Sequence, residues 1–382
     1  MAVEQLVDAV KAAVAAQRTL RIAGAGSKAF YGNAVDGELL ETRSHQDITA
    51  YEPTELVITA RCGTPLADVE KALADRGQIL PFEPPYFGGS AQTGPPYFGG
   101  SAQTQPPHFS NNATFGGAIA SGLSGPRRAA NNGYYGAVRD YVLGCKIIDG
   151  KGDVLSFGGQ VMKNVAGYDV SRLMAGSMGT LGVILEVSLK VLPAPVASRT
   201  LRLVMRDQGA VINQLNEWGG LPLPITATAY HDADVSVRLE GAEAAVNSAA
   251  KKLGGEAIDA AGAVAFWCGL RDQTDGFFAG TEPLWRLSVP STTVPLDLPG
   301  RQLIEWGGAL RWLKTNAPHE AIRKLARQVG GHATLFRADD QLKRAAGVFT
   351  PLDPVLARVH KNLKATFDPH GIFNRGRMYP EF

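Results

Sequence analysis

The segment from Phe157 to Pro193 constrains the fold more than any other part of the chain. Its first part is rich in glycine at loop spacings, which lets the backbone adopt positive φ angles or lie directly against a ligand. Asp169 is placed to cap a short helix that ends at Gly176. From Val183 onward apolar and polar residues alternate, which predicts a half-buried strand. We therefore expect a loop, a short helix, a glycine turn and a strand that shape a surface around a flat, polar ligand.

Length and charge limit the classes of protein to consider. A chain of 382 residues exceeds one ordinary core and predicts two domains. A formal net charge of +2 without basic runs gives no reason to expect nucleic acid. Residues 1–17 predict an amphipathic helix, and no apolar run is long enough to cross a bilayer. We expect a cytoplasmic protein.

The three cysteines are far apart in the sequence and form no C-x-x-C pair: Cys62, Cys145 and Cys268. This spacing suggests neither a disulfide framework nor a cysteine metal cluster. No set of His, Cys, Asp and Glu falls at ligand spacing either. We expect no metal site.

A second glycine-rich loop follows the predicted strand at residues 19–23. Gly24 to Ala29 formally satisfies the G-x-G-x-x-G/A pattern of dinucleotide-binding folds. That interpretation requires a helix directly afterwards, and Phe30 to Asn33 offers no helical period. Two alternatives remain: a short loop between strands whose N–H groups hold a phosphate, or an ordinary glycine turn.

A tandem repeat interrupts the chain after Glu83. The ten residues from Pro84 to Thr93 recur without change from Pro95 to Thr104. Proline, glycine and the absence of charge predict an extended loop without regular structure. A tolerated insertion is favoured over a functional lid.

Small residues dominate the next segment, Ala113 to Gly125, which predicts either a close approach of backbone to a ligand or a tight crossing between strands. Arg127 and Arg128 come directly after it. Adjacent arginines are typical of a solvated loop, although one of them beside a phosphate-binding segment would neutralise a diphosphate.

Four motifs occur in a characteristic order. They are Gly24-Ala25-Gly26-Ser27-Lys28, Ala113-Thr114-Phe115-Gly116-Gly117, the run from Val161 to Asp169 with Gly176-Ser177-Met178-Gly179-Thr180-Leu181-Gly182, and Phe367-Asp368-Pro369-His370-Gly371-Ile372-Phe373-Asn374-Arg375-Gly376-Arg377. Together they resemble the FAD-linked oxidases of the vanillyl-alcohol-oxidase/PCMH type. Within that group they are most similar to the family of FAD-binding E subunits of bacterial glycolate oxidases. The likeness extends over nearly the whole chain.

The resemblance implies non-covalent FAD. The first loop would wrap the pyrophosphate, and the tail would close over the flavin. Lys163 would favour a reduced, anionic flavin by its charge, unless it is simply exposed. The implied cofactor-binding residues are Ala23, Gly24, Ala25, Gly26, Ser27, Lys28, Thr114, Phe115, Gly116, Gly117, Ala120, Ser121, Gly122, Lys163, Gly167, Tyr168, Gly176, Gly179, Gly182, Val183, Asn374 and Arg377.

The chain departs from the family pattern in two places. Arg375 stands where the tail motif usually has proline, and the repeats from Pro84 to Gln105 have no counterpart in the relatives. The first glycine loop contains no histidine, so the covalent histidyl-flavin of some relatives is not expected.

The resemblance also implies an α+β fold: a PCMH-type FAD-binding domain of two subdomains with a ferredoxin-like α+β cap domain. Short strands and helices alternate from about residue 198 to residue 347, as such a cap requires. We expect the FAD-binding domain at residues 1–197, the cap at 198–347, and a C-terminal helix and tail that return to the FAD domain at 348–382.

Catalytic residues are harder to predict. Oxidation of a 2-hydroxy acid needs a base for the hydroxyl proton, a cation for the carboxylate and the flavin as hydride acceptor. Catalytic dehydrogenases that resemble this fold carry an H-x-G-D-x-N-x-H run in the cap. The nearest candidate is His332, which has neither partner and is more typical of a structural residue, as are His360 and His370.

Three functional classes therefore stay open. The favoured one is the FAD-binding subunit of a complex that oxidises glycolate to glyoxylate. The resemblance implies that a homologous catalytic flavin subunit and an iron–sulfur subunit are its partners. Any membrane association would come through that complex. The alternatives are a self-sufficient FAD-dependent 2-hydroxy-acid dehydrogenase and a non-catalytic structural flavoprotein.

Overall fold

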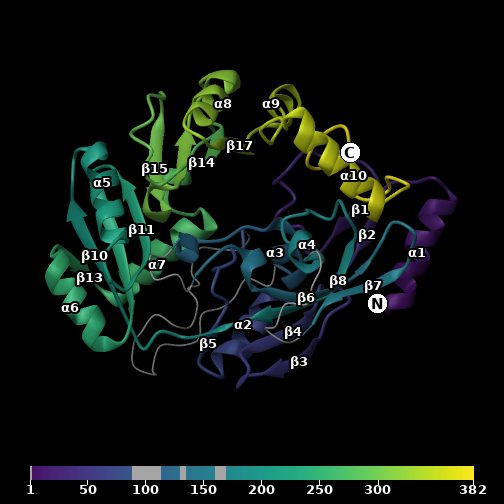
Figure 1. Ribbon diagram of the computed structural model, residues 1–382, viewed down its shortest axis with the longest axis horizontal. Coiled ribbons are helices and arrows are strands. Elements are labelled where there is room, and N and C mark those ends of the chain that lie inside the picture. Colours follow the sequence, from purple (N-terminus) through teal and green to yellow (C-terminus); the bar gives the residue numbers. More distant parts are fainter. Residues whose placement is uncertain (1, 88–112, 130–134, 160–168) are drawn as a thin grey trace.

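The computed structural model describes residues 2–87, 113–129, 135–159 and 169–382. Figure 1 shows two main sheets with the C-terminal helices beside the first strands of the chain. The repeats from Pro84 to Gln105 lie largely outside the described residues. Among the helices that the structure describes, none has the length and apolar character needed to cross a membrane. The mixture of helices and sheets confirms the predicted α+β class.

The first main sheet is antiparallel and has five strands in the order β3-β4-β8-β6-β7. Their bounds are β3 Ile48–Glu52, β4 Val57–Arg61, β8 Val183–Lys190, β6 Val142–Ile148 and β7 Val154–Gly158. The core on this sheet includes residues of helices α2 (Leu66–Ala74), α3 (Phe115–Ser121) and α4 (Val170–Met174). Asp169 caps α4 by accepting from the Arg172 amide, as predicted.

Strand β8 is more deeply buried than its alternating sequence predicts. It lies in the middle of the sheet, where Ser188 is buried and its hydroxyl is 2.8 Å from the Thr59 hydroxyl on β4. A strand with neighbours on both edges and residues packed on both faces is enclosed whatever its alternation. The expectation of a half-buried strand was therefore wrong.

A small parallel pair, β1 (Leu20–Ala23) and β2 (Glu38–Glu41), lies beside helix α1 (Val3–Ala15). Leu20 also bridges to Phe373 in the tail, which joins the two ends of the chain. A core cluster with members on α1, β1, β8 and the tail holds this corner together. A second short pair, β5 (Gln78–Ile79) and β9 (Leu192–Pro193), is antiparallel.

The second main sheet has eight strands in the order β13-β10-β12-β11-β15-β16-β14-β17. Their bounds are β13 Glu256–Ile258, β10 Ala197–Val204, β12 Asp234–Gly241, β11 Ile225–His231, β15 Arg301–Glu305, β16 Leu310–Lys314, β14 Leu284–Ser288 and β17 His332–Arg337. Six of these strands lie where the sequence predicts strands, at residues 201–205, 225–230, 235–239, 284–289, 308–313 and 332–336, whereas β13, β15 and helix α7 (Ala260–Asp272) were not predicted. We refer to this sheet as the cap sheet.

Different helices pack on the two faces of the cap sheet. Helices α5 (Gln208–Gly219) and α6 (Glu243–Leu253) share one core cluster with its strands, and α8 (His319–Gln328) belongs to another. A third cluster combines cap-sheet residues with Trp267 on α7 and with Tyr31 and Met178 from the N-terminal part of the chain. This face of the cap sheet therefore turns toward the glycine loops.

The C-terminal segment returns to the first strands, as Figure 1 shows. It contains α9 (Asp340–Ala346) and α10 (Pro354–Phe367). Lys364 on α10 is buried and donates to the carbonyls of Thr180 and Phe373 and to the Asp368 carboxylate, each at 2.7 Å. One side chain thus holds the glycine turn before β8 and the tail in place.

Candidate functional site: a pocket formed by the glycine loops

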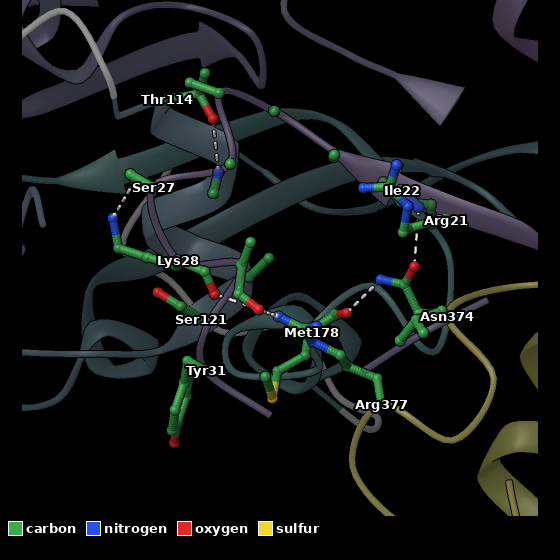
Figure 2. Close-up of a pocket in the computed structure, with 18 residues that line it drawn as sticks. Arg21, Ile22, Ser27, Lys28, Tyr31, Thr114, Ser121, Met178, Asn374 and Arg377 are labelled. Carbon is green, nitrogen blue, oxygen red and sulfur yellow. Dashed lines mark hydrogen bonds between the residues drawn. The ribbon is translucent and has the colours of Figure 1, made fainter. Parts of the chain in front are cut away.

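Four separated parts of the chain meet around one pocket (Figure 2). They are β1 with its glycine loop, helix α3, the turn at Met178 and the C-terminal tail. The pocket has an empty volume of about 730 Å³, including space open to solvent. Its lining residues are Arg21, Ile22, Ala23, Gly24, Ala25, Gly26, Ser27, Lys28, Ala29, Tyr31, Val35, Thr114, Gly117, Ala120, Ser121, Met178, Asn374 and Arg377.

Two glycines set the path of the first loop. A Cβ atom at Gly24 would overlap the Thr114 hydroxyl, so the loop reaches α3 only with glycine at this position. Gly26 has a φ of 77°, in the left-handed region, and nothing lies within 4 Å of the place where a Cβ would be, so its backbone is uncovered on that side. A side-chain-free loop that faces a cavity fits a diphosphate, because its N–H groups are accessible. The residues present therefore fit a dinucleotide.

Asn374 fastens the tail to two other walls of the pocket. Its Oδ1 accepts from the Ile22 amide at 2.8 Å, and its Nδ2 donates to the Met178 carbonyl at 2.7 Å (Figure 2). The side chain is buried and the φ angle is 38°, a value that asparagine tolerates better than most residues. Asn374 therefore holds β1 and the Met178 turn at a fixed separation.

Arg377 holds the far end of the first loop. Its guanidinium donates to the carbonyls of Asn33 and Ala29, both at 2.9 Å, and of Lys28 at 3.2 Å. Burial, with a smaller effect of Arg21, lowers the pKa of Arg377 to about 10, so it stays charged at neutral pH. Closure of Asn374 and Arg377 over a flavin stays a prediction; the structure shows that Asn374 joins β1 to the Met178 turn and that Arg377 holds the first loop.

Lys28 is a half-buried cation in the lining. Its Nζ is 3.4 Å from the Ser27 hydroxyl and 5.8 Å from the centre of the Phe87 ring. Burial lowers its pKa to about 8, although Asp272 acts in the opposite direction. Lys28 is mostly protonated at pH 7 and places a positive charge beside the exposed loop backbone.

The structure places the predicted cofactor residues in three groups. Those that line the pocket are Ala23, Gly24, Ala25, Gly26, Ser27, Lys28, Thr114, Gly117, Ala120, Ser121, Asn374 and Arg377. Those that pack against neighbouring protein atoms are Phe115, Gly116, Gly122, Gly176, Gly179, Gly182 and Val183. Those outside the described residues are Lys163, Gly167 and Tyr168. Contact of any of them with FAD stays a prediction.

Six lining residues were not among the predicted ones: Arg21, Ile22, Ala29, Tyr31, Val35 and Met178. Tyr31 and Met178 both belong to the cluster that reaches the cap sheet, and Tyr31 packs on Phe336 with ring centres 5.1 Å apart. Tyr31 was considered only within Phe30 to Asn33, which offers no helical period, although an aromatic residue next to a glycine loop was an available signal. Met178 has a φ of 54°, which its sequence gives no means to foresee.

Arg127 is also placed differently from either expectation. It is buried and paired with Glu83 at 3.3 Å and with Glu240 on β12 at 2.9 Å. Arg238 on β12 completes the group with its own pair to Glu83 at 3.0 Å. We call these four residues the paired cluster. It joins Glu83, before α3, and Arg127, after α3, to the cap sheet, so Arg127 is neither solvated nor free for a diphosphate.

His332 is the first residue of β17 and is exposed to solvent. Its neighbour across the sheet is Ser288 on β14. This position is on the cap sheet, whereas the loops that line the pocket belong to the other part of the fold. His332 remains an untested candidate for the catalytic base.

Comparison with known proteins places this chain in a family. Residues 2–104 match a model of an FAD binding domain. The chain is 48% identical to the glycolate oxidase subunit GlcE of Escherichia coli (strain K12) over 378 residues, which cover 99% of this chain and 97% of that protein. It belongs to the GlcE family of glycolate oxidase subunits.

More distant similarities agree with this family. A stretch of 105 residues, 28% of this chain and 22% of the relative, is 42% identical to the glycolate oxidase subunit GlcD of Bacillus subtilis (strain 168). Among solved structures, p-cresol methylhydroxylase aligns over 99% of this chain and 87% of its own, with a TM-score of 0.64 and 14% identity. An alkyldihydroxyacetonephosphate synthase aligns over 97% and 75%, with a TM-score of 0.63 and 14% identity.

These findings confirm the recognition made from the motifs and the predicted fold class. This GlcE-family chain has a PCMH-type fold and carries an FAD binding domain. FAD is therefore the cofactor of this chain, and the pocket is the candidate site for it.

Proposed function

We propose that the chain is the FAD-binding subunit of a glycolate oxidase complex. It would work with a homologous catalytic flavin subunit and an iron–sulfur subunit that takes the electrons onward. The observation that carries this proposal is the end-to-end identity of 48% with a glycolate oxidase subunit. The pocket supports it, because four chain segments expose backbone around a space of suitable size. The complex, in the cytoplasm, would meet any membrane through its partners.

FAD, when bound, supplies a two-electron acceptor for the hydride of a 2-hydroxy acid. The chain's own residues prepare the place where this occurs. Gly24 and Gly26 leave the loop backbone accessible, and Lys28 supplies a positive charge toward a diphosphate. Asn374 and Arg377 fix the loop from the tail.

The domain arrangement is part of this proposal. Residues 1–197 and 348–382 would form the FAD-binding unit, because the tail pairs with β1 and Lys364 ties it to the turn before β8. Residues 198–347 would form the cap that covers the cofactor and excludes water. The buried ion pairs of the paired cluster would then join the two units.

The test is to purify the chain with and without its partner subunits and to measure FAD content and flavin absorbance during titration with glycolate. We expect the isolated chain to hold FAD and to be bleached by glycolate only in the reconstituted complex. Bleaching of the isolated chain would instead show a self-sufficient dehydrogenase. A colourless chain that binds no added FAD would show a structural subunit.

A further inference from the structure

Two arginines from distant parts of the chain meet at one tryptophan. The guanidinium carbon of Arg128 is 4.6 Å from the centre of the Trp306 ring, and that of Arg286 is 5.1 Å from it. Arg128 belongs to the 3₁₀ helix η1 (Pro126–Ala129), Arg286 to β14 and Trp306 to the 3₁₀ helix η4 (Trp306–Gly308). We call Arg128 and Arg286 the open arginine pair.

The open arginine pair is held in a defined geometry. The Trp306 indole N–H donates to the Gly125 carbonyl at 3.0 Å, which fixes the ring against the start of η1. Arg286 lies in a strand interior, opposite Trp312 on β16 and Thr334 on β17. Neither guanidinium is therefore on a free loop end, and both are half-buried.

Neither arginine of the pair has a carboxylate partner. Within the described ranges, no Asp or Glu forms an ion pair with Arg128 or Arg286. The remaining ranges, 88–112, 130–134 and 160–168, contain no Asp or Glu in their sequence. Exposed Asp140 acts on Arg128 at longer range without pairing with it.

The acidic residue next to Trp306 does not neutralise the pair either. Glu305 is buried, and this burial raises its pKa to about 8, against weaker opposing effects that include Arg286. Glu305 is therefore mostly neutral at pH 7. Two positive charges in a partly desolvated place without a counter-charge are unfavourable unless an anion joins them.

The open arginine pair lies on the side of the cap sheet that faces the FAD pocket. Phe336 on β17 packs on Trp312 with ring centres 4.9 Å apart and on Tyr31 with ring centres 5.1 Å apart. Trp312 is the strand neighbour of Arg286, and Tyr31 lines the pocket. A continuous row of aromatic rings thus leads from the pocket lining to the arginines.

We propose that Arg128 and Arg286, whose guanidiniums both lie against the Trp306 ring, bind the carboxylate of a small 2-hydroxy acid. This inference rests on the proposed function, because it names where that function's substrate is held. A guanidinium offers parallel N–H donors that match the two oxygens of a carboxylate, and a partly buried setting strengthens such bonds. Aromatic walls favour a short acid over one with a charged tail.

The test uses the full-length chain with its bound FAD and oxalate as the probe, since oxalate has two carboxylates and no hydride to transfer. Binding is followed by the flavin absorbance difference and, independently, by intrinsic tryptophan fluorescence. Wild type is expected to show saturable binding by at least one signal. Arg286→Gln and Arg128→Gln are each expected to raise the dissociation constant roughly 10- to 100-fold, because each removes a charge-assisted contact.

Two controls make the result specific. Arg301→Gln changes an exposed arginine on β15 of the same sheet and is expected to leave oxalate binding and FAD content unchanged. Arg286→Lys keeps the charge without the planar fork and is expected to fall between wild type and Arg286→Gln. Arg128→Gln, on a short turn, keeps the test valid if Arg286→Gln lowers the yield of folded protein.

Oxalate binding by both glutamine variants at wild-type affinity would overturn the inference. So would a wild-type chain that holds FAD but responds to oxalate by neither signal, while the proposed flavoprotein function would survive. A wild-type chain without FAD would overturn the proposed function instead. In that case the fluorescence titration still decides whether the arginines bind a carboxylate.

Discussion

Arg127 and Arg128 are neighbours in the chain and have opposite surroundings. Arg127 is enclosed in the paired cluster, where two carboxylates and two guanidiniums balance. Arg128 faces Trp306 and Arg286, with no carboxylate bound to it among the described residues. A neutralised group of buried charges joins parts of a fold, whereas an unneutralised one is available to a ligand. Of these two consecutive residues, Arg127 therefore stabilises the fold, whereas Arg128 is available to bind a ligand.

The same contrast is visible in two buried glutamates. Burial alone would raise the pKa of Glu83, but Arg127 and Arg238 hold it down to about 2. Burial raises the pKa of Glu305 to about 8, because the opposing effects of the Trp312 side chain and of Arg286 are weaker than the effect of burial. Glu83 is thus an anion in the folded protein at pH 7, and Glu305 is mostly neutral.

The largest expected effect is on the paired cluster. Arg127→Gln leaves two buried carboxylates to share Arg238, and we expect the free energy of unfolding to fall by about 3–5 kcal/mol. Urea unfolding of the FAD-loaded chain, followed by circular dichroism, measures it. A loss below about 1 kcal/mol would show that the cluster does not hold the cap sheet to the rest of the fold.

Asn374→Ala is expected to have the next largest effect. It leaves the Ile22 amide and the Met178 carbonyl without their partner, and we expect a loss of about 2–3 kcal/mol together with a lower FAD-to-protein ratio. The neighbouring Arg375 is exposed, so Arg375→Ala is the matched control and should retain both stability and FAD. Normal FAD retention in Asn374→Ala would contradict the positioning role.

The fold was largely predictable from local patterns. Alternation indicated β8, and Asp169 indicated the start of α4, because both signals act over a few residues. The burial of β8 was not predictable, since it depends on β4 and β6 lying on either side. Local patterns carry no information on which strand ends up in the middle of a sheet.

The glycine loops that line the pocket could be predicted from the sequence, but the partners of the charged side chains could not. The glycines marked the pocket, since a close approach or a positive φ selects that residue type wherever it occurs. The ion pair of Arg127 with Glu240 could not be predicted, because Glu240 lies 113 positions away in the chain. Nothing local distinguishes an arginine that will meet two carboxylates from its neighbour that will meet a tryptophan.

The pH dependence of stability sharpens the contrast between Glu83 and Glu305. Since the folded pKa of Glu305 is raised, its contribution to stability is complete below about pH 4.5 and is lost as the pH rises toward 8. Since that of Glu83 is lowered, its contribution is present above about pH 4.5 and is lost as the pH falls toward 2. Ionisation of Glu305 therefore lowers the stability of the fold at high pH, and protonation of Glu83 lowers it at low pH.

Glu305→Gln isolates the first effect, because glutamine does not ionise. We expect the variant to gain stability over wild type as the pH rises from 4.5 to 8, by at most about 1.4 kcal/mol per pH unit, and to match it below that window. Unfolding curves across pH 4 to 9 measure the difference. A constant difference at every pH would mean that folding leaves the pKa of Glu305 unchanged.

The smallest expected effect on stability is that of Arg128→Gln. The variant loses the contact with the Trp306 ring, which contributes on the order of 0.5–1 kcal/mol, and gains relief from the repulsion by Arg286. We expect these to offset each other, so that the free energy of unfolding stays within about 1 kcal/mol of wild type in the same urea experiment as Arg127→Gln. If Arg128→Gln lowered the free energy of unfolding as much as Arg127→Gln, Arg128 would also be needed to hold the fold together. Because the two substitutions are the same chemical change at adjacent positions, a difference between them reports the surroundings of each guanidinium and not the nature of the substitution.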